Sequence, residues 1–172
     1  QADRLSKIIQ RVRTYAKRQH HEVKQENLSE IVDRALVSFR RSSLSSGVDV
    51  EVKAPGKADA LADALELELL IVNLLKNAAA ASKDSREKLI SVQLSEEANE
   101  WLLSVSDHGQ VISDKLLSRL SHPAKSFSDG LGLGLSICRL IAENHGGKLT
   151  FKPNNSKGLI VTLHLPKANK EI

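Results

Sequence analysis

Four stretches of the chain carry apolar residues at the spacing of an amphipathic helix. In residues 3–20 the apolar positions lie three and four residues apart and form a narrow seam, which is typical of helices that pack in bundles. Residues 28–41 and 134–145 have a broader apolar face, and residues 63–82 are rich first in leucine and then in alanine. The pattern therefore predicts four helices over these ranges.

Shorter stretches alternate apolar with polar residues, as half-buried strands do. They predict five strands, at residues 48–53, 89–95, 101–106, 148–153 and 159–165. Residues 107–133 are rich in Ser, Asp and Gly and predict a long loop with one short apolar piece around Leu116 to Leu120. The order of these elements predicts an α+β fold, a two-layer sandwich with the helices on one face of a mixed, mostly antiparallel sheet.

The composition bounds the kind of protein. The 172 residues, 41% of them hydrophobic and 27% charged, suffice for one main domain with a full core. No run of about 18 apolar residues is present, so no membrane-spanning segment is predicted. The single cysteine, Cys138, has no partner for a disulfide or a zinc cluster, which favours a reducing compartment. Because the chain begins at Gln1 and contains no methionine, we expect it to be an internal piece of a longer protein.

The net charge of +4 is confined to one end of the chain. Residues 1–24 hold seven Lys and Arg residues against two acidic ones, whereas the other residues hold 18 basic against 19 acidic side chains. The body is therefore nearly neutral and lacks the broad basic footprint of a nucleic-acid-binding domain. Five aromatic residues are also too few for a base-stacking platform, so nucleic acid is not an expected partner.

Two asparagines stand out in the predicted helix 63–82. Asn73 and Asn77 are four residues apart, so their amides project from one face of the helix. A neutral amide oxygen is a suitable ligand for Mg²⁺, which keeps several waters and also binds substrate phosphates. The alternative is a pair of ordinary solvent-facing amides.

Asp107-His108-Gly109 follows the predicted strand 101–106. A carboxylate at a strand end can face a cleft and accept hydrogen bonds from an amino group such as that of adenine. The alternative is a simple turn.

Three glycines alternate with leucines in the run that begins at Gly130 and leads into the predicted helix 134–145. Without side chains, their backbone N–H groups can approach a phosphate, and the helix N-terminus adds partial positive charge. A flexible linker is the alternative, although the interleaved leucines argue against a fully solvated one. The run is neither a dinucleotide-binding fingerprint nor a Walker loop, because no strand leads directly into it and no Gly-Lys-Ser/Thr follows.

Together, the order and spacing of these motifs resemble the catalytic ATP-binding domain of sensor histidine kinases. Their superfamily also contains gyrase-type, heat-shock-chaperone and mismatch-repair ATPases. The shared pattern is Asn-Leu-Leu-x-Asn-Ala, then Asp-x-Gly, then Gly-Leu-Gly-Leu-Gly-Leu-Ser-Ile, then His-Gly-Gly and a hairpin. The resemblance implies a Bergerat-type ATP-binding fold over residues 23–168, with 169–172 as a tail. Residues 1–22 resemble the second helix of the dimerisation and phosphotransfer hairpin.

The resemblance also implies a role for each motif residue. Asn77 is expected to ligate Mg²⁺, with Asn73 beside it near the phosphates of ATP. Asp107 is expected to hold the adenine amino group, and Gly109 to let the base approach. The remaining expected contacts with the nucleotide are the phosphate cradle at Gly130, Gly132 and Gly134, a phosphate contact at Lys125, and packing by Ile112 and Leu135.

Three departures from the family pattern are visible. Val111 replaces the last glycine of Asp-x-Gly-x-Gly, so a Cβ there is expected to crowd the loop and lower the affinity for nucleotide. The lid segment 120–126 matches the usual lid poorly. The phosphoacceptor box of the family is absent. His21-Glu22 resembles the His-Glu pair that opens this box, but it lies in the polar joint at residues 20–24, after the predicted helix 3–20.

The resemblance implies the kinase half of a two-component sensor, a protein-histidine kinase that binds Mg·ATP. It would pass the γ-phosphoryl group to a histidine outside this chain, for relay to an aspartate in the receiver domain of a response regulator. The full-length protein is expected to be a homodimer through the hairpin, with this part in the cytoplasm and membrane contact only through segments outside the chain. The alternatives are a nucleotide-binding or interaction module with degenerate catalysis, and another ATPase of the superfamily.

Overall fold

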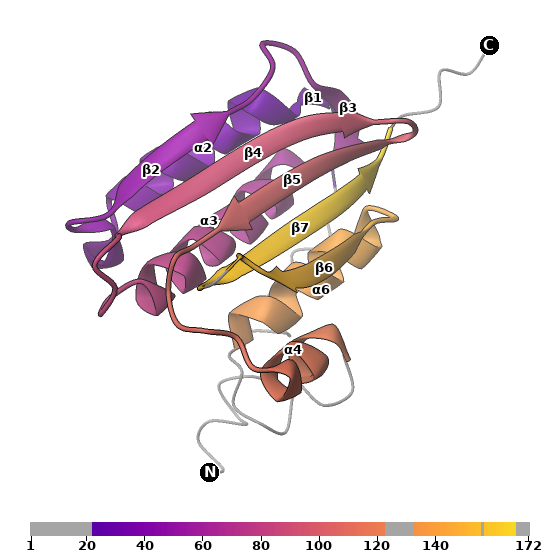
Figure 1. Cartoon of the computed structure of the whole chain (residues 1–172). Helices are drawn as coiled ribbons and strands as arrows, with labels where there is room; N and C mark the ends of the chain where they lie inside the picture. The colour runs from indigo at the N-terminus through magenta and orange to yellow at the C-terminus, as the bar shows by residue number, and fades with distance from the viewer. Residues whose placement is uncertain (1–21, 123–132, 156, 168–172) are drawn as a thin grey trace, which may run out of the picture.

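The computed structural model describes residues 22–122, 133–155 and 157–167 of the chain (Figure 1). The element order alternates short helical and strand segments in the first half and ends in a hairpin. In sequence the elements are β1 (Lys24–Asn27), α2 (Leu28–Arg40), the 3-10 turn η1 (Ser43–Ser45), β2 (Asp49–Lys53), β3 (Asp59–Ala62), α3 (Ala64–Ala81), β4 (Leu89–Glu97), β5 (Glu100–Ser106), α4 (Asp114–Ser121), α6 (Leu133–Asn144), β6 (Lys148–Pro153) and β7 (Leu159–Pro166).

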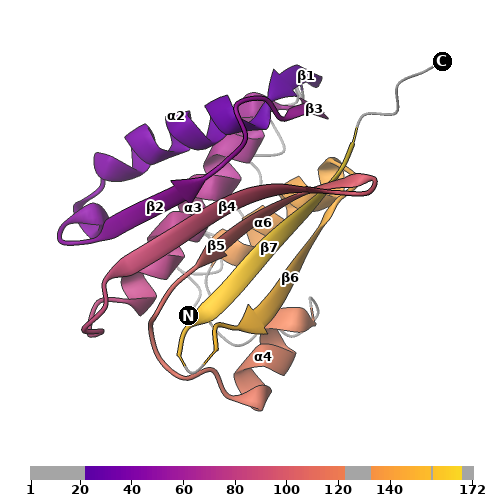
Figure 2. The same ribbon diagram turned by 45° about the horizontal axis from the view of Figure 1, so that its top comes forward.

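One five-stranded sheet forms the body of the fold, with the strand order β2-β4-β5-β7-β6. The edge strand β2 runs parallel to β4, and the other neighbours are antiparallel. Helices α2, α3 and α6 all cover the same face of this sheet, as Figures 1 and 2 show. The structure therefore confirms the predicted two-layer α+β sandwich with a mixed, mostly antiparallel sheet.

The core lies between the helix layer and the sheet, and α3 is its central helix. On one face of α3, Leu67, Leu70, Ile71, Leu74 and Leu75 are almost fully buried, and the small residues Ala78 and Ala79 are buried in its last turns. Each fully buried side chain of this size contributes about 1.5–3 kcal/mol from removal of apolar area from water. Other fully buried side chains come from α2, β4, α6 and β7: Ile31, Phe39, Ile90, Ile141 and Leu163.

Two strands and one helix differ from the sequence-based prediction. Strands β1 and β3 pair with each other as a separate antiparallel ribbon, in which Gln25 lies opposite Leu61. The polar joint predicted at residues 20–24 is therefore wrong at its end, because Lys24 begins β1. Within the predicted loop 107–133, the apolar piece forms α4, which Ser113 caps by accepting a hydrogen bond from the Leu116 N–H at 3.1 Å. The predicted helix 3–20 lies outside the described residues.

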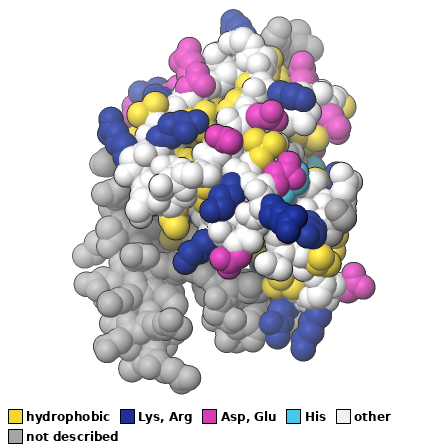
Figure 3. All heavy atoms as spheres, turned by 60° about the vertical axis from the view of Figure 1, so that its left-hand side comes forward, with side chains coloured by type: hydrophobic (Ala, Val, Ile, Leu, Met, Phe, Trp, Pro, Cys, Tyr) yellow, Lys and Arg dark blue, Asp and Glu magenta, His cyan; other side chains and the backbone are white. Residues whose placement is uncertain are grey.

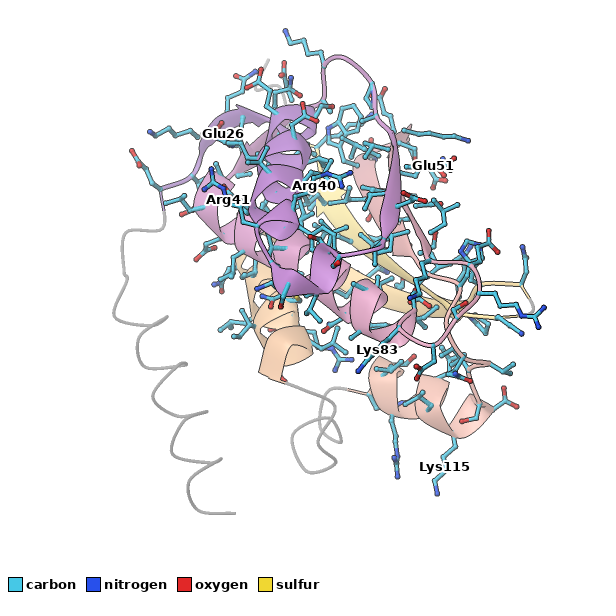
Figure 4. The ribbon with its side chains drawn as sticks, turned by 90° about the vertical axis from the view of Figure 1, so that its left-hand side faces the viewer. Glu26, Arg40, Arg41, Glu51, Lys83 and Lys115 are labelled. Carbon is cyan, nitrogen blue, oxygen red and sulfur yellow. The ribbon has the colours of Figure 1, made fainter. Side chains whose placement is uncertain are left out.

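The surface agrees with a nearly neutral body. On the face shown in Figure 3, Lys and Arg side chains are interspersed with Asp and Glu rather than gathered into one basic area. Figure 4 shows individual members of this mixture, such as Arg40 near the end of α2 and Glu51 on β2. Within the described part of the chain, no helix is both long and apolar enough to cross a lipid bilayer.

Candidate functional site

A cavity of about 390 Å³ opens between the C-terminal part of α3, the start of α6, α4 and the sheet. Its volume lies within the usual range for small-ligand sites, and most of its wall is apolar. Three of its side chains are polar and therefore available to orient a ligand: Asn77, Asp107 and Gln110. The apolar wall consists of Leu74, Ala78, Ala81, Val105, Ile112, Leu116, Leu120, Leu135, Leu159 and Val161.

Asp107 lies directly after β5 and is only 5% exposed. One carboxylate oxygen, Oδ1, accepts a hydrogen bond from the Gly109 N–H at 2.8 Å, and the Asp107 N–H donates to the Leu159 carbonyl at 3.1 Å. Burial raises the pKa of the carboxyl above its ordinary value of 3.8, and the hydrogen bond from the Gly109 N–H opposes this shift. A carboxylate in an apolar wall gains from a ligand N–H group, because such a donor replaces the lost hydration.

Two glycines allow the backbone to pack tightly around Asp107. A Cβ at Gly109 would lie 2.6 Å from the Ala81 carbonyl oxygen at the end of α3. Gly158, in the β6–β7 turn, has a φ of +94°, and a Cβ there would lie 2.0 Å from the Asp107 carbonyl oxygen. Gly109 thus joins the Asp107 loop to α3 and does not itself line the cavity, so its role toward an adenine ring stays a prediction.

The β6–β7 turn supports Asp107 in a second way, through Asn154. The Asn154 Nδ2 donates a hydrogen bond to the Asp107 carbonyl at 2.7 Å, and the Gly158 N–H donates to the Gln110 carbonyl at 2.9 Å. In the sequence, residues 154–158 only separate two predicted strands of a hairpin, and this support for Asp107 is not predicted. Asn154 and Gly158 are typical turn residues and so predict the turn, but their residue types do not predict which segment the turn packs against.

Helix α3 places both candidate asparagines near the cavity, but in different surroundings. Asn77 lines the cavity and is exposed to it. Asn73, one turn earlier, is half-buried and lies beside the start of α6, because a Cβ at Gly134 would be 3.4 Å from the Asn73 Oδ1. The buried side chains on the other face of α3 fix this orientation, as the sequence predicts.

The start of α6 brings two more candidate residues to the site. Leu135 lines the cavity, and Gly134 lies against Asn73. The first N–H groups of any helix lack intrahelical partners and favour an anion, so this end of α6 suits a phosphate. The other expected phosphate contacts, Lys125, Gly130 and Gly132, lie outside the described residues.

Val111 and Ile112 take opposite positions. Ile112 lines the cavity as predicted. Val111 is 68% exposed and faces a separate hollow on the other side of the Asp107 loop. Val111 therefore does not line the cavity, and its effect on the affinity for nucleotide stays a prediction.

The polar groups at the cavity suit a metal ion that arrives with its ligand. In the described part of the chain, no three His, Cys, Asp or Glu side chains are grouped to hold a metal by themselves. Mg²⁺ is commonly bound through one or two protein oxygens together with substrate phosphates and waters. The Asn77 amide oxygen at the cavity, with the N-terminus of α6 nearby, fits such an ion and not a protein-only metal centre.

Comparison with known proteins identifies a family for this part of the chain. Residues 62–169 match the family described as histidine kinase-, DNA gyrase B-, and HSP90-like ATPase. This range contains α3, the Asp107 loop, α6 and the final hairpin, so it includes every element that lines the cavity.

Similar proteins and structures extend the likeness to nearly the whole chain. The chain is 31% identical to the sensor protein FixL of Bradyrhizobium diazoefficiens and to the C4-dicarboxylate transport sensor protein DctS of Rhodobacter capsulatus, over 99% and 96% of its length. It spans only 34% and 26% of those two proteins. The catalytic domain of histidine kinase ThkA superposes with a TM-score of 0.70 at 27% identity, covering 85% of this chain and 96% of that domain.

A larger ThkA structure, in complex with the response regulator protein TrrA, has the same fold with a TM-score of 0.74 at 24% identity. The superposition covers 99% of this chain and 49% of the ThkA chain. The matched family, the sensor-kinase relatives and the cavity with its buried aspartate agree, and the chain therefore belongs to the histidine kinase-, DNA gyrase B- and HSP90-like ATPases, as an ATP-binding domain of the histidine kinase type.

Proposed function

We propose that this chain is the catalytic part of a sensor histidine kinase, which binds Mg·ATP in the cavity and transfers the γ-phosphoryl group to a histidine outside the chain. The observation that carries the proposal is the buried Asp107 carboxylate in an otherwise apolar cavity that Asn77 also lines. A flat apolar base with an amino group fits such a cavity, and the phosphates then extend toward α3 and α6.

Each described residue has a distinct task in this proposal. Asp107 accepts a hydrogen bond from the adenine amino group, and Ile112 and Leu135 pack against the base. Asn77 supplies an amide oxygen to Mg²⁺, with Asn73 beside it. When bound, Mg²⁺ neutralises charge on the phosphates, which is the main requirement of phosphoryl transfer besides positioning. Gly134 and the first N–H groups of α6 contact the phosphates.

The reaction follows from this placement. The bond between the γ-phosphorus and the bridging oxygen of ATP breaks, a phosphorus–nitrogen bond to the histidine ring forms, and ADP leaves. The proton of the attacking ring nitrogen passes to a base or to solvent. The phosphoryl group is then available to an aspartate of a receiver domain, a partner class supported by the ThkA structure in complex with a response regulator.

The relatives are sensor proteins of which this chain spans about a third or less, so we place the acceptor-bearing first helix of the dimerisation hairpin and the sensing segments outside it, with residues 1–22 as the second helix of that hairpin. A homodimer through that hairpin and a position on the cytoplasmic side of a bacterial membrane belong to the same proposal. The competing function, a module with degenerate catalysis, is suggested by Val111 and by the atypical lid segment 120–126. Val111 is exposed and does not line the cavity, whereas residues 123–126 of the lid lie outside the described residues.

A transfer assay tests the proposal. The purified chain is mixed with γ-labelled ATP and Mg²⁺, with and without a separately supplied hairpin that carries the acceptor histidine. We expect label on the hairpin only, stable to base and labile to acid, and none on the chain alone. Binding of ATP without any transfer to the hairpin would support the degenerate module instead. Stable label on the chain itself, mapped to His21, would contradict the assignment of the acceptor to another segment.

A further inference from the structure

Asp63 joins three parts of the fold at the end of α3 that lies away from the cavity. Its side-chain Oδ1 accepts hydrogen bonds from the N–H groups of Leu65 and Glu66, both at 3.1 Å, and so caps the start of α3. The other oxygen, Oδ2, accepts from the backbone N–H of Glu22 at 2.9 Å. The Asp63 side chain is therefore held by the first turn of α3 and by the chain that precedes β1.

His145 connects the same point to the end of α6. The Asp63 N–H donates to the His145 Nε2 at 3.0 Å, and the His145 Nδ1 lies 2.7 Å from the Ile141 carbonyl in the last turn of α6. A carbonyl only accepts, so Nδ1 carries the proton and Nε2 is the acceptor. Glu66 of α3 lies 3.8 Å from Nδ1, and the imidazole is 1% exposed. The Nε2 nitrogen thus links the end of α6 to the start of α3, and the Nδ1 nitrogen holds the ring on the last turn of α6.

Helices α3 and α6, which Asp63 and His145 link, are also the helices that bring candidate residues to the nucleotide site. From Asp63 to Asn73 and Asn77 the distance along α3 is about 15–20 Å, and from His145 back to Gly134 along α6 it is about 16 Å. Between the two ends the helices are in contact at Cys138, whose Sγ lies 3.6 Å from the Leu70 carbonyl, and Ile141 and Ala142 of α6 are fully buried. In Figures 1 and 2 the β1–β3 ribbon, which leads into Asp63, and α4, which lines the cavity, lie at opposite ends of this helix pair.

We propose that Asp63 and His145 are positioning residues that couple the backbone at Glu22 to the nucleotide site. The hydrogen bond from the Glu22 N–H holds this backbone on the start of α3, and His145 links the end of α6 to the same residue. A displacement of the Glu22 backbone therefore alters how α3 and α6 meet at Asn73 and Gly134. The inference rests on the proposed nucleotide-binding function of that site, but its bonds do not touch the nucleotide.

Four substitutions separate the coupling from simple structural support. Asp63→Asn keeps an oxygen for the cap of α3 and places an amide nitrogen against the Glu22 N–H, so it breaks the bond to Glu22. His145→Leu removes the acceptor of the Asp63 N–H. The matched controls are Glu22→Ala, which keeps the backbone donor, and His145→Gln, which keeps an acceptor and a donor on a side chain of similar reach.

Affinity for Mg·ADP is measured by calorimetry on the whole 172-residue chain, with cooperative melting as the check of folding. Asp63→Asn and His145→Leu are expected to weaken binding by about fivefold or more, as a typical coupling between sites. The controls are expected to stay within about twofold, as substitutions that break no such bond do. The double variant is expected to bind less weakly than the product of the single effects, since both changes interrupt one path.

A second readout does not depend on binding. In the ligand-free protein, Asp63→Asn is expected to shift the NMR signals of the Asn73 and Asn77 side-chain amides and of the Gly134 N–H, whereas Glu22→Ala leaves them in place. Wild-type affinity and unshifted signals in folded Asp63→Asn would overturn the coupling. Failure of the unaltered chain to bind nucleotide would contradict the proposed function alone. The NMR shifts would still decide whether a change at Asp63 alters the surroundings of Asn73, Asn77 and Gly134.

Discussion

Asp107 is the buried acidic side chain in the wall of the candidate nucleotide cavity, and several bonds hold it in place. Its carboxylate lies in an apolar wall, its Oδ1 accepts from Gly109, and its backbone is held by Leu159 and Asn154. The chain order of Asp107, Gly109 and Ile112 is visible in the sequence, and so is their place after a strand. The support from Asn154 is not visible there, because that residue lies 47 positions away and is brought to Asp107 by the pairing of β5, β7 and β6.

Replacing Asp107 by Asn tests the carboxylate as the acceptor for adenine. We expect Asp107→Asn to weaken ATP binding about ten- to a hundredfold, because a hydrogen bond to a charged group contributes about 1.5–3 kcal/mol. The amide keeps an oxygen for the Gly109 N–H, so folding is expected to survive. Titration calorimetry of both proteins measures the difference, and an unchanged affinity would remove Asp107 from the binding site.

The same variant carries a pH prediction for the ligand-free protein. Since burial raises the pKa of Asp107 above 3.8, the folded state holds this proton more tightly than the unfolded state. The contribution of Asp107 to stability is therefore complete below pH 3.8 and is lost as the pH rises through the higher pKa of the folded protein. Melting curves from pH 3 upward should show Asp107→Asn gaining stability relative to the unaltered chain, up to a plateau.

Gly158 is the residue for which the structure demands the absence of a side chain most strongly. Its φ of +94° and the 2.0 Å approach of a hypothetical Cβ to the Asp107 carbonyl predict that Gly158→Ala destabilises the fold by about 1–3 kcal/mol or more. Gly56→Ala is the matched control, because nothing lies within 4 Å of its Cβ position. Thermal melts compare the two, and an equal effect on both midpoints would contradict the tight packing of the β6–β7 turn.

At the scale of elements, helix α3 was well predicted and the β1–β3 ribbon was not. The apolar spacing of residues 63–82 reports the buried face of α3 directly, and the predicted ends differ from Ala64–Ala81 by one residue at each end. Strands β1 and β3 are four residues long, and β1 is polar throughout, so no alternation marks them. Their pairing joins residues far apart in sequence, which local patterns do not report.

Asn77, on the exposed face of α3, is the proposed ligand of Mg²⁺, and its replacement tests this role. Asn77→Ala is expected to weaken binding of Mg·ATP strongly and binding of metal-free nucleotide much less, because the contacts at Asp107 are untouched. The ligand-free midpoint should hardly fall, since alanine favours helix and no core volume is lost. Asn144→Ala, at the end of α6, is the matched control. A large drop of the ligand-free midpoint with an unchanged Mg·ATP shift would reject the metal role.

At the scale of the whole molecule, the layers were predictable and the strand order was not. Helices with one apolar face must cover a sheet, and strands with alternating residues leave one sheet face for solvent, so this combination favours a two-layer sandwich. The order β2-β4-β5-β7-β6 and the parallel pair β2–β4 depend on contacts between distant segments. The site forms where three such segments meet, and this explains why its motifs are visible in the sequence while the cavity shape and the outward position of Val111 are not.

The central claim is that the cavity selects an adenine nucleotide through Asp107, and a competition between ATP and GTP tests it most directly. Guanine presents an oxygen where adenine presents its amino group, so the buried carboxylate would face an acceptor and lose its hydrogen bond. Calorimetric titration of the whole chain in Mg²⁺ should show ATP binding at least about tenfold more tightly than GTP. In Asp107→Asn this preference should shrink markedly. Equal affinity of the unaltered chain for ATP and GTP, or no binding of either, would contradict the account.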